Sequence, residues 1–176
     1  MKALHVALLV VTAISASPIC ARSSHEVTIE EDRFSKVVTF RGAIEGHNPL
    51  LGTSRTWYLR SWLNRDTGVV EHQLHVLLDY IGDRRDYWRA ADDDAEPLGV
   101  ERLGRLKVAR HCDICAYFET VRIEMPEQLL RAKAASGFQV KIYARSGDSV
   151  ILDISAEDIA AQFDAIARYA AHMPSR

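Results

Sequence analysis

Two alternating stretches on either side of a glycine turn constrain the fold more than any other part of the sequence. Apolar and polar side chains alternate in residues 56–64 and again in residues 70–80. A period of two residues is typical of a β-strand with one buried face. Between them, Arg65-Asp66-Thr67-Gly68 suits a type I turn with its glycine in the left-handed conformation. The sequence therefore predicts a β-hairpin. Its buried face would hold Trp57, Leu59 and Leu63 from the first strand, and Val70, His72, Leu74, Val76, Leu78 and Tyr80 from the second.

Further strands and two helices complete the expected fold. Strands are predicted at 34–40, around Tyr87 and Trp88, and at 100–110, 116–125, 138–144 and 149–154. Pro126 opens a helix that stops at Gly137, and Ser155 caps a final helix with Asp158 three residues on. Ile159, Phe163, Ile166 and Ala170 form an apolar stripe on that helix. We expect an α+β fold, a mostly antiparallel sheet built as a meander of hairpins, with two helices on one face and the last at the C-terminus.

The first 21 residues have the three parts of a secretory signal peptide. Lys2 supplies the charge, residues 4–14 are apolar, and small residues precede Arg22. The apolar run is shorter than the roughly 20 residues that span a bilayer, and no comparable stretch follows. We therefore expect cleavage after Ala21, with Ala16 as the competing site. Residues 22–176 would form a single soluble α+β domain in the periplasm or outside the cell.

Cys20 raises the question of a lipid anchor. A lipoprotein signal carries a Leu-like residue three positions before its cysteine and Gly or Ala just before it. Those positions are Ser17 and Ile19 in this chain. The sequence therefore predicts that Cys20 carries no lipid.

Charge narrows the range of partners. The chain has a net charge of −2 at pH 7, and its basic and acidic residues are interspersed. The sequence has no basic stripe of the kind that binds nucleic acid, so no nucleic-acid partner is expected. The longest acidic run, Asp92-Asp93-Asp94 followed by Glu96, indicates a solvated loop. It lacks the alternating oxygen ligands and glycine turn of a calcium loop, and we expect no cofactor.

Cys112 and Cys115 lie between two predicted strands, at the tip of a hairpin. In an oxidising compartment such a pair is expected to form a disulfide. The loop that it closes is short, so the stabilisation would be modest. A redox role would need a helix after the cysteines, whereas residues 116–123 are strand-like. Covalent haem attachment would need a histidine where Ala116 stands.

A zinc site is the remaining alternative for the cysteine pair. It needs two further ligands, and no second cysteine pair exists. His111, His72 and His75 are the candidates. A strand would send His72 and His75 to opposite faces. We expect His72 to be a hydrogen-bonded core residue and His75 to be a surface residue.

An aromatic strip is the candidate binding surface. Tyr58, Arg60 and Trp62 share the face of their strand that lies opposite Trp57, so all these rings cannot belong to one core. Aromatic and arginine side chains are typical of contact surfaces. No Gly-x-Ser-x-Gly elbow, His-Glu-x-x-His motif or phosphate-cradling glycine loop is present in the sequence. The sequence therefore favours a protein that is not an enzyme.

Several segments together resemble a group of known proteins. They are Tyr58-Leu59-Arg60-Ser61-Trp62, Thr67-Gly68, His72-Gln73-Leu74, the cysteine pair, and residues 140–148. On these segments the chain resembles small exported or lipid-anchored bacterial envelope proteins of uncharacterised function. The resemblance implies an envelope location and no catalytic residues.

Two hypotheses follow from the sequence. The first is a soluble, periplasmic, non-enzymatic binding module that uses its sheet to bind an unidentified envelope protein or ligand, and that a Cys112–Cys115 disulfide stabilises. The alternative is a thiol–disulfide or zinc-dependent enzyme centred on His111, Cys112 and Cys115. A strand after Cys115 would favour the first, and a helix would favour the second. A role as an inhibitor is also open.

Overall fold

A computed structural model describes residues 25–47, 53–108 and 115–173. The predicted signal peptide, Cys20, His111 and Cys112 lie outside the described residues. Within the described ranges, no helix is both long and apolar enough to cross a membrane.

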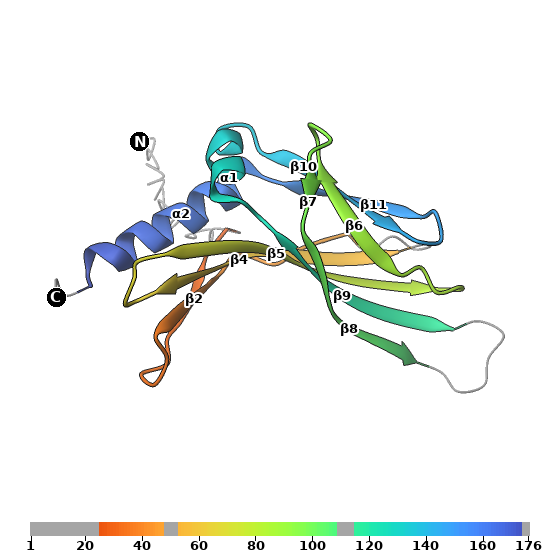
Figure 1. Cartoon of the computed structure of the whole chain (residues 1–176), viewed down its shortest axis with the longest axis horizontal. Coiled ribbons are helices and arrows are strands. Elements are labelled where there is room, and N and C mark those ends of the chain that lie inside the picture. Colours follow the sequence, from red (N-terminus) through yellow and green to blue (C-terminus); the bar gives the residue numbers. More distant parts are fainter. Residues whose placement is uncertain (1–24, 48–52, 109–114, 174–176) are drawn as a thin grey trace, which may run out of the picture.

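A large antiparallel sheet forms the base of the molecule (Figure 1). Its strands run in the order β1-β2-β4-β5-β9-β8, and β3 pairs with β4 beside β2. These strands are β1 (Thr28–Glu30), β2 (Val37–Arg41), β3 (Glu45–His47), β4 (Ser54–Asn64), β5 (Val70–Ile81), β8 (Val100–Val108) and β9 (Ala116–Glu124). The predicted hairpin is confirmed as β4 and β5, and Gly68 has a φ of 71° in its turn.

A smaller sheet and two helices lie on one face of the large sheet. Its order is β11-β10-β6-β7. The elements are β6 (Tyr87–Asp92), β7 (Pro97–Leu98), β10 (Phe138–Ala144), β11 (Ser149–Ile154), α1 (Glu127–Lys133) and α2 (Ala156–Ala171). The predicted α+β class is therefore confirmed: the chain is mostly antiparallel strands with two helices, the last at the C-terminus. The sequence did not predict that the strands divide into two sheets.

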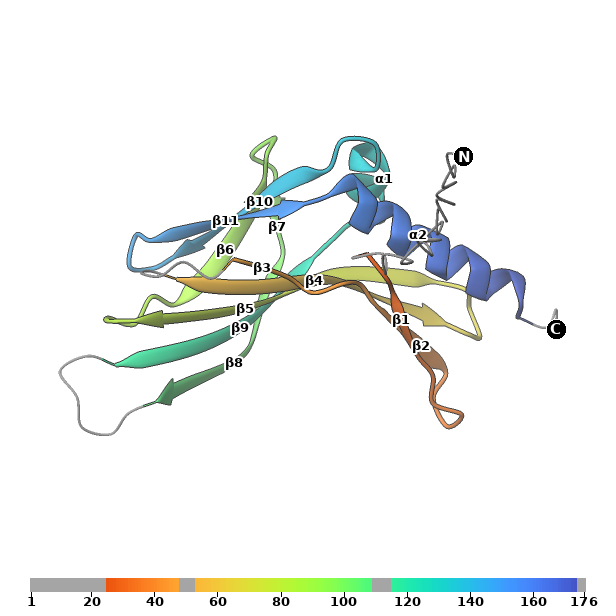
Figure 2. The ribbon, with the colours of Figure 1, turned by 180° about the vertical axis from the view of Figure 1, so that it is seen from behind.

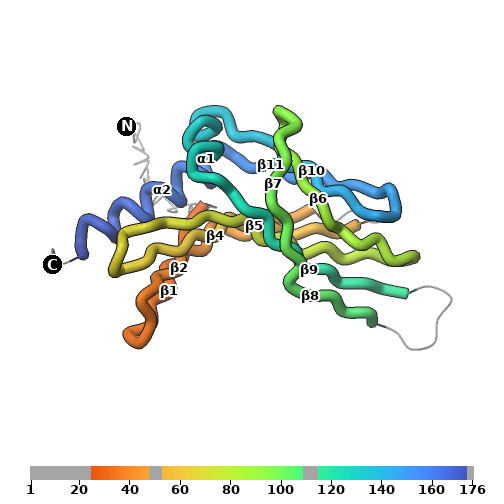
Figure 3. Tube along the Cα trace, viewed as in Figure 1, coloured from red at the N-terminus to blue at the C-terminus, as the bar shows by residue number. Residues whose placement is uncertain are grey.

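The core lies between these layers. The small sheet covers one half of the large sheet and α2 runs along the other half, as the view from behind in Figure 2 and the trace in Figure 3 also show. The predicted inner face of the hairpin is confirmed: Leu59, Leu74 and Val76 pack against Val140 and Ile142 of β10. A second cluster joins Val38, Phe40 and Leu63 to Ala165 and Ile166 of α2. The opposite face of the large sheet is called the outer face below.

Buried polar contacts fix α2 to the large sheet. Ser61 Oγ lies 2.7 Å from His72 Nδ1. The Gln162 side-chain amide donates to Ser61 Oγ at 2.8 Å and to the Phe40 carbonyl at 3.1 Å. His72 is therefore the hydrogen-bonded core histidine that the sequence predicted. The predicted N-cap is also confirmed, because the Asp158 backbone N–H donates to Ser155 Oγ at 3.0 Å.

Four local predictions are wrong. Phe34 is 82% exposed and precedes β2, because Asp32 and Ser35 form a turn there. Ala170 is exposed, because at this point the helix turns Tyr169 and not Ala170 toward the second cluster. Asp92 is buried rather than solvated, since its carboxylate accepts from the backbone N–H groups of Asp94 and Glu96. Pro126 lies just before α1 as its N-cap residue, rather than within it.

Candidate functional site

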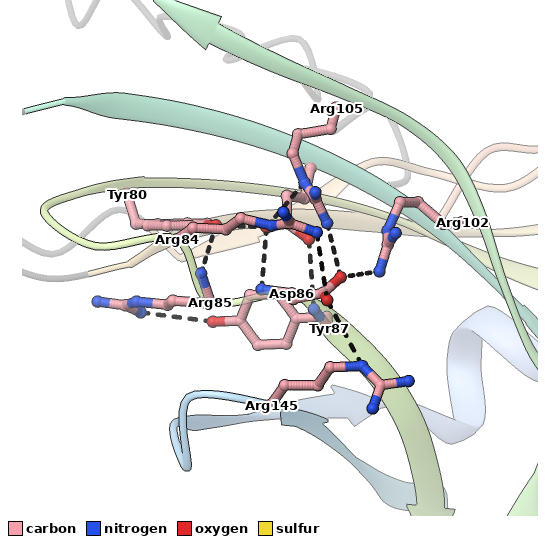
Figure 4. A network of polar contacts seen from close by, with 9 residues as sticks. Tyr80, Arg84, Arg85, Asp86, Tyr87, Arg102, Arg105 and Arg145 are labelled. Carbon is pink, nitrogen blue, oxygen red and sulfur yellow. Dashed lines mark hydrogen bonds and ion pairs between the residues drawn. The ribbon is translucent and has the colours of Figure 1, made fainter.

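A cluster of arginines surrounds one carboxylate where the two sheets meet at β6 and β8 (Figure 4). Asp86 Oδ1 pairs with Arg102 and lies 2.6 Å from Arg105. Asp86 Oδ2 lies 3.4 Å from Arg84 and 3.5 Å from Arg145. One side chain is therefore held by four guanidinium groups from three separate parts of the chain. We call these residues, with Arg85 and Glu119, the arginine cluster.

The backbone of Asp86 is fixed independently of its side chain. Asp86 has a φ of 62°, a left-handed conformation that asparagine and aspartate adopt more readily than most residues. Its N–H donates to Glu119 at 3.2 Å, and its carbonyl accepts from the Arg145 N–H at 3.0 Å. The backbone of Asp86 therefore has partners of its own, besides those of its carboxylate.

Glu119 anchors the cluster from below. Its side chain is fully buried on β9 and accepts hydrogen bonds from the Tyr80 hydroxyl and, at 3.3 Å, from the Tyr87 N–H. Arg105 Nε lies 3.4 Å from the same carboxylate. Burial, and then the hydrogen bond to Glu119, raise the pKa of Tyr80 to about 12. Tyr80 therefore stays protonated and donates to Glu119 at neutral pH.

Arg85 extends the cluster toward the β10–β11 turn. Its guanidinium lies 4.6 Å from the centre of the Tyr80 ring, and its Nε is 3.5 Å from a carboxylate oxygen of Asp148.

Burial, and then the neighbouring charge of Arg105, lower the pKa of Arg102. Like charges are thus crowded together in this part of the molecule.

Positive charge exceeds negative charge in this network. The contacts join five arginines, at positions 84, 85, 102, 105 and 145, to three carboxylates, at positions 86, 119 and 148. The excess is local, because the whole chain carries a net charge of −2. Arg84 and Arg145 have side chains that are 54% and 62% exposed, whereas that of Glu119 is 0% exposed. Arg84 and Arg145 therefore face solvent, whereas the side chains of Arg85, Arg102 and Arg105 are 19%, 35% and 20% exposed and Glu119 is buried beneath them.

A β-bulge explains why the sequence did not reveal this cluster. Arg102 and Arg105 are three residues apart, and a regular strand would send them to opposite faces. The register of β8 shifts between Arg102 and Gly104. As a result Arg102 faces Val121 and Arg105 faces Glu119, both on the inner side of the sheet. The pair Arg84-Arg85 in a turn was the one local signal of a basic site.

The predicted strip lies on the outer face of the large sheet. Tyr58, Arg60 and Trp62 are half-buried, and Arg60 lies 4.9 Å from the Trp62 ring centre. The prediction that His75 is a surface residue is wrong: it is 8% exposed. Its ring stacks on Tyr58 with a centroid distance of 5.3 Å, and Trp62 lies 6.2 Å away. The strip is therefore a layer of packed rings with a histidine at its centre.

The strip stays a predicted contact surface, and a double variant tests it. Replacing Arg60 and Trp62 with alanine is expected to remove capture of envelope partners in a pull-down from envelope extract, because both hot-spot side chains are lost. Arg33→Ala combined with Phe34→Ala, an exposed cation–ring pair outside the large sheet, is the matched control. Unchanged capture by the first variant would refute the strip.

The cysteine prediction can be followed in part. Cys115 is half-buried and lies directly before β9, which begins at Ala116. Cys112 and His111 lie outside the described residues. The predicted disulfide and the alternative zinc site therefore stay predictions, while the predicted strand after Cys115 is confirmed.

Among the residues that the structure describes, two groups of side chains have the donor types of a metal site. The first group is His25, Glu45 and Asp158, near the start of α2. The second is Asp92, Asp93 and Asp94, at the end of β6. Both groups have contacts within the protein that account for their positions. His25 Nδ1 is 2.7 Å from Asp158, and Lys133 Nζ is 2.9 Å from Asp93 and 2.8 Å from Asp94.

We find no match to this chain among models of known protein families, curated proteins or solved structures. Its function is therefore inferred from the chemistry of its own residues, and the arginine cluster is the arrangement with the most specific chemistry.

Proposed function

We propose that this chain is an exported, non-enzymatic binding module that recognises an anionic group at the arginine cluster. The observation that carries the proposal is the local excess of five guanidinium groups over three carboxylates. Guanidinium is planar, permanently charged and matched to the geometry of phosphate and carboxylate oxygens.

Repulsion among the arginines of the cluster would favour the binding of an anion. The pKa of Arg102 is lowered by burial and then by the like charges of Arg105, Arg84 and Arg145, while the charge of Glu119 raises it. A second anion would relieve this repulsion, and the partly buried setting would weaken the screening by solvent and salt. The Asp86 carboxylate occupies the middle of the cluster in the unbound protein and would turn aside for a ligand of higher charge.

The contacts support binding rather than catalysis. Tyr80, with a pKa of about 12, holds its proton and gives its hydrogen bond to Glu119. Glu119 is fully buried and accepts from two backbone N–H groups. Both groups therefore serve to hold the loop before β6 in position.

Calorimetric titration with pyrophosphate at low ionic strength tests the proposal. The wild-type protein is expected to bind it, and Arg102→Gln combined with Arg105→Gln is expected to bind at least about tenfold more weakly. The two removed groups are the ones that hold Asp86 Oδ1. Affinity should also fall as salt is added, because the attraction is electrostatic.

A control separates local recognition from general charge. Arg33 and Arg168 are exposed and lie outside the cluster, and replacing both with glutamine removes the same net charge. This control is expected to bind pyrophosphate as the wild type does. Equal losses in both double variants, or no binding by the wild type, would contradict the proposal.

The alternative of a thiol–disulfide or zinc enzyme has weaker support. β9 begins directly after Cys115, so the helix N-terminus that lowers a thiol pKa in a redox motif is replaced by a strand. Insulin reduction and the intact mass of the native protein discriminate between the two functions. Reducing activity or retained zinc would favour the enzyme.

A further inference from the structure

The arginine cluster continues onto the exposed face of the small sheet. Arg145 is the link, because its Nε lies 3.5 Å from Asp86 and its guanidinium lies 4.8 Å from the Trp88 ring centre. Figure 4 shows Arg145 reaching Asp86 from the end of β10, while Arg102 and Arg105 reach it from β8. A ligand held by the cluster would therefore lie next to Trp88 at the start of β6.

Two more cations follow along the same strands. Tyr143 pairs with Arg89 across β10 and β6, and the next outward residue on β10 is Lys141. The Arg89 guanidinium is 4.1 Å from the Tyr143 ring centre, and Lys141 Nζ is 5.1 Å from it. Val140, Ile142 and Ala144 alternate with these residues and are buried. Lys141 and Tyr143 therefore face away from the core. We call Arg145, Arg89 and Lys141 the cationic track.

The two aromatic rings beside the track, Tyr143 and Trp88, are in contact with its cations. Cations of the protein lie over both Tyr143 and Trp88. Such contacts hold a cation in place through the ring quadrupole. The rings therefore position the charges, and the charges are what the surface presents to a ligand. This arrangement favours a ligand recognised by its anionic groups over one recognised by ring stacking.

The length of the track sets the size of the ligand. Lys141 lies within β10 and Arg145 directly follows its last residue, so the backbone between them spans at most about 13 Å. The arginines of β8 adjoin the Arg145 end of the track, because Arg102 and Arg145 contact the same carboxylate of Asp86. A single oxyanion could contact one end of this surface and would leave the other cations unused.

We infer that the ligand is a linear polyanion that runs from the arginine cluster across the exposed face of the small sheet. The inference rests on the proposed function and extends it from a single anionic group to a chain of them. The cluster holds one group of the chain, and Arg145, Arg89 and Lys141 hold the following ones. Recognition comes from the spacing of positive charges, so phosphate and carboxylate chains share the chemistry it requires.

A length series tests the inference. Pyrophosphate, tripolyphosphate and a long polyphosphate are titrated into the wild-type protein at several salt concentrations. Affinity for the long chain is expected to exceed that for pyrophosphate by at least about tenfold, and its dependence on salt should be steeper because more counterions are released. Oligoglutamate of matched charge shows whether carboxylates serve as well as phosphates; tighter binding of either chain identifies the preferred group.

Variants separate the track from the cluster. Arg89→Gln combined with Lys141→Gln is expected to bind pyrophosphate normally, to bind the long chain about tenfold more weakly, and to lower its salt slope by roughly 1 to 1.5. Arg33→Gln combined with Arg168→Gln is the charge-matched control. If the wild type binds pyrophosphate but shows no gain with length, the polyanion inference is wrong and the proposed function stands. If the wild type binds none of these anions, the proposed function itself fails.

Discussion

Replacing Glu119 with alanine is expected to lower the free energy of unfolding by about 3–5 kcal/mol. The fully buried carboxylate accepts from the Tyr80 hydroxyl and from the backbone N–H groups of Asp86 and Tyr87, and it pairs with Arg105. The substitution leaves the Tyr80 hydroxyl and two backbone N–H groups without this acceptor, and it removes one of the two carboxylates that pair with Arg105. Urea denaturation at pH 7 measures the change.

Two further variants separate the loss of the Glu119 charge from the loss of its hydrogen-bond acceptor. Glu119→Gln keeps an acceptor oxygen and loses the charge, so a smaller loss of about 1–3 kcal/mol is expected. Glu124→Ala removes an exposed carboxylate from the end of the same strand and should change stability by less than about 0.5 kcal/mol. If Glu119→Ala were as stable as Glu124→Ala, the buried carboxylate would not be holding the loop before β6.

Acidification is expected to destabilise the fold through His75, by up to about 3 kcal/mol between pH 7 and pH 4. Burial, and then the charges of Arg60 and Arg122, lower the pKa of His75 to about 4. The unfolded chain takes up a proton at this residue near pH 6.5, whereas the folded protein does not until about pH 4. Stability contributed by His75 is therefore complete above pH 6.5 and is lost as the pH falls toward 4.

The His75→Gln variant isolates this effect. His72 also has a pKa lowered by burial, so the wild-type pH profile combines both residues. The difference in unfolding free energy between wild type and His75→Gln should shrink as the pH falls from 7 to 4. Replacing His47, which is exposed on β3, should leave the profile unchanged. Parallel profiles for wild type and His75→Gln would show that the ring remains accessible to protons.

Local patterns were enough to predict most of the strands. The alternation in residues 56–64 and 70–80 reflects one buried face, and Gly68 supplies the left-handed turn that joins them. The helix cap at Ser155 depends on residues three positions apart, and it too was predictable. These features depend on short-range physics, so a single sequence contains the necessary information.

The features that the sequence did not predict depend on contacts between distant parts of the chain. Alternation in the sequence identifies a strand but does not show which strand it pairs with. The separation of β6, β7, β10 and β11 into a second sheet was therefore not predicted. His75 was correctly placed on the face opposite His72, but its burial comes from the rings of Tyr58 and Trp62 packed over it. The hairpin of β8 and β9 was predicted, but the arginine cluster also needed the bulge between Arg102 and Gly104 and the approach of Arg145 to Asp86. None of these contacts is local in the chain.

The path of the chain between β5 and β9 has a consequence for folding. These two strands are neighbours in the large sheet, yet the chain forms β6, β7 and β8 before it returns from one to the other. Closing so long a loop costs entropy that the contacts across it must offset together. Arg102 on β8 and Arg145 after β10 reach Asp86 from distant parts of the chain, so these contacts require the assembled sheets. A ligand bound among them would therefore favour the folded state as a whole, and its affinity would appear as a rise in the melting temperature.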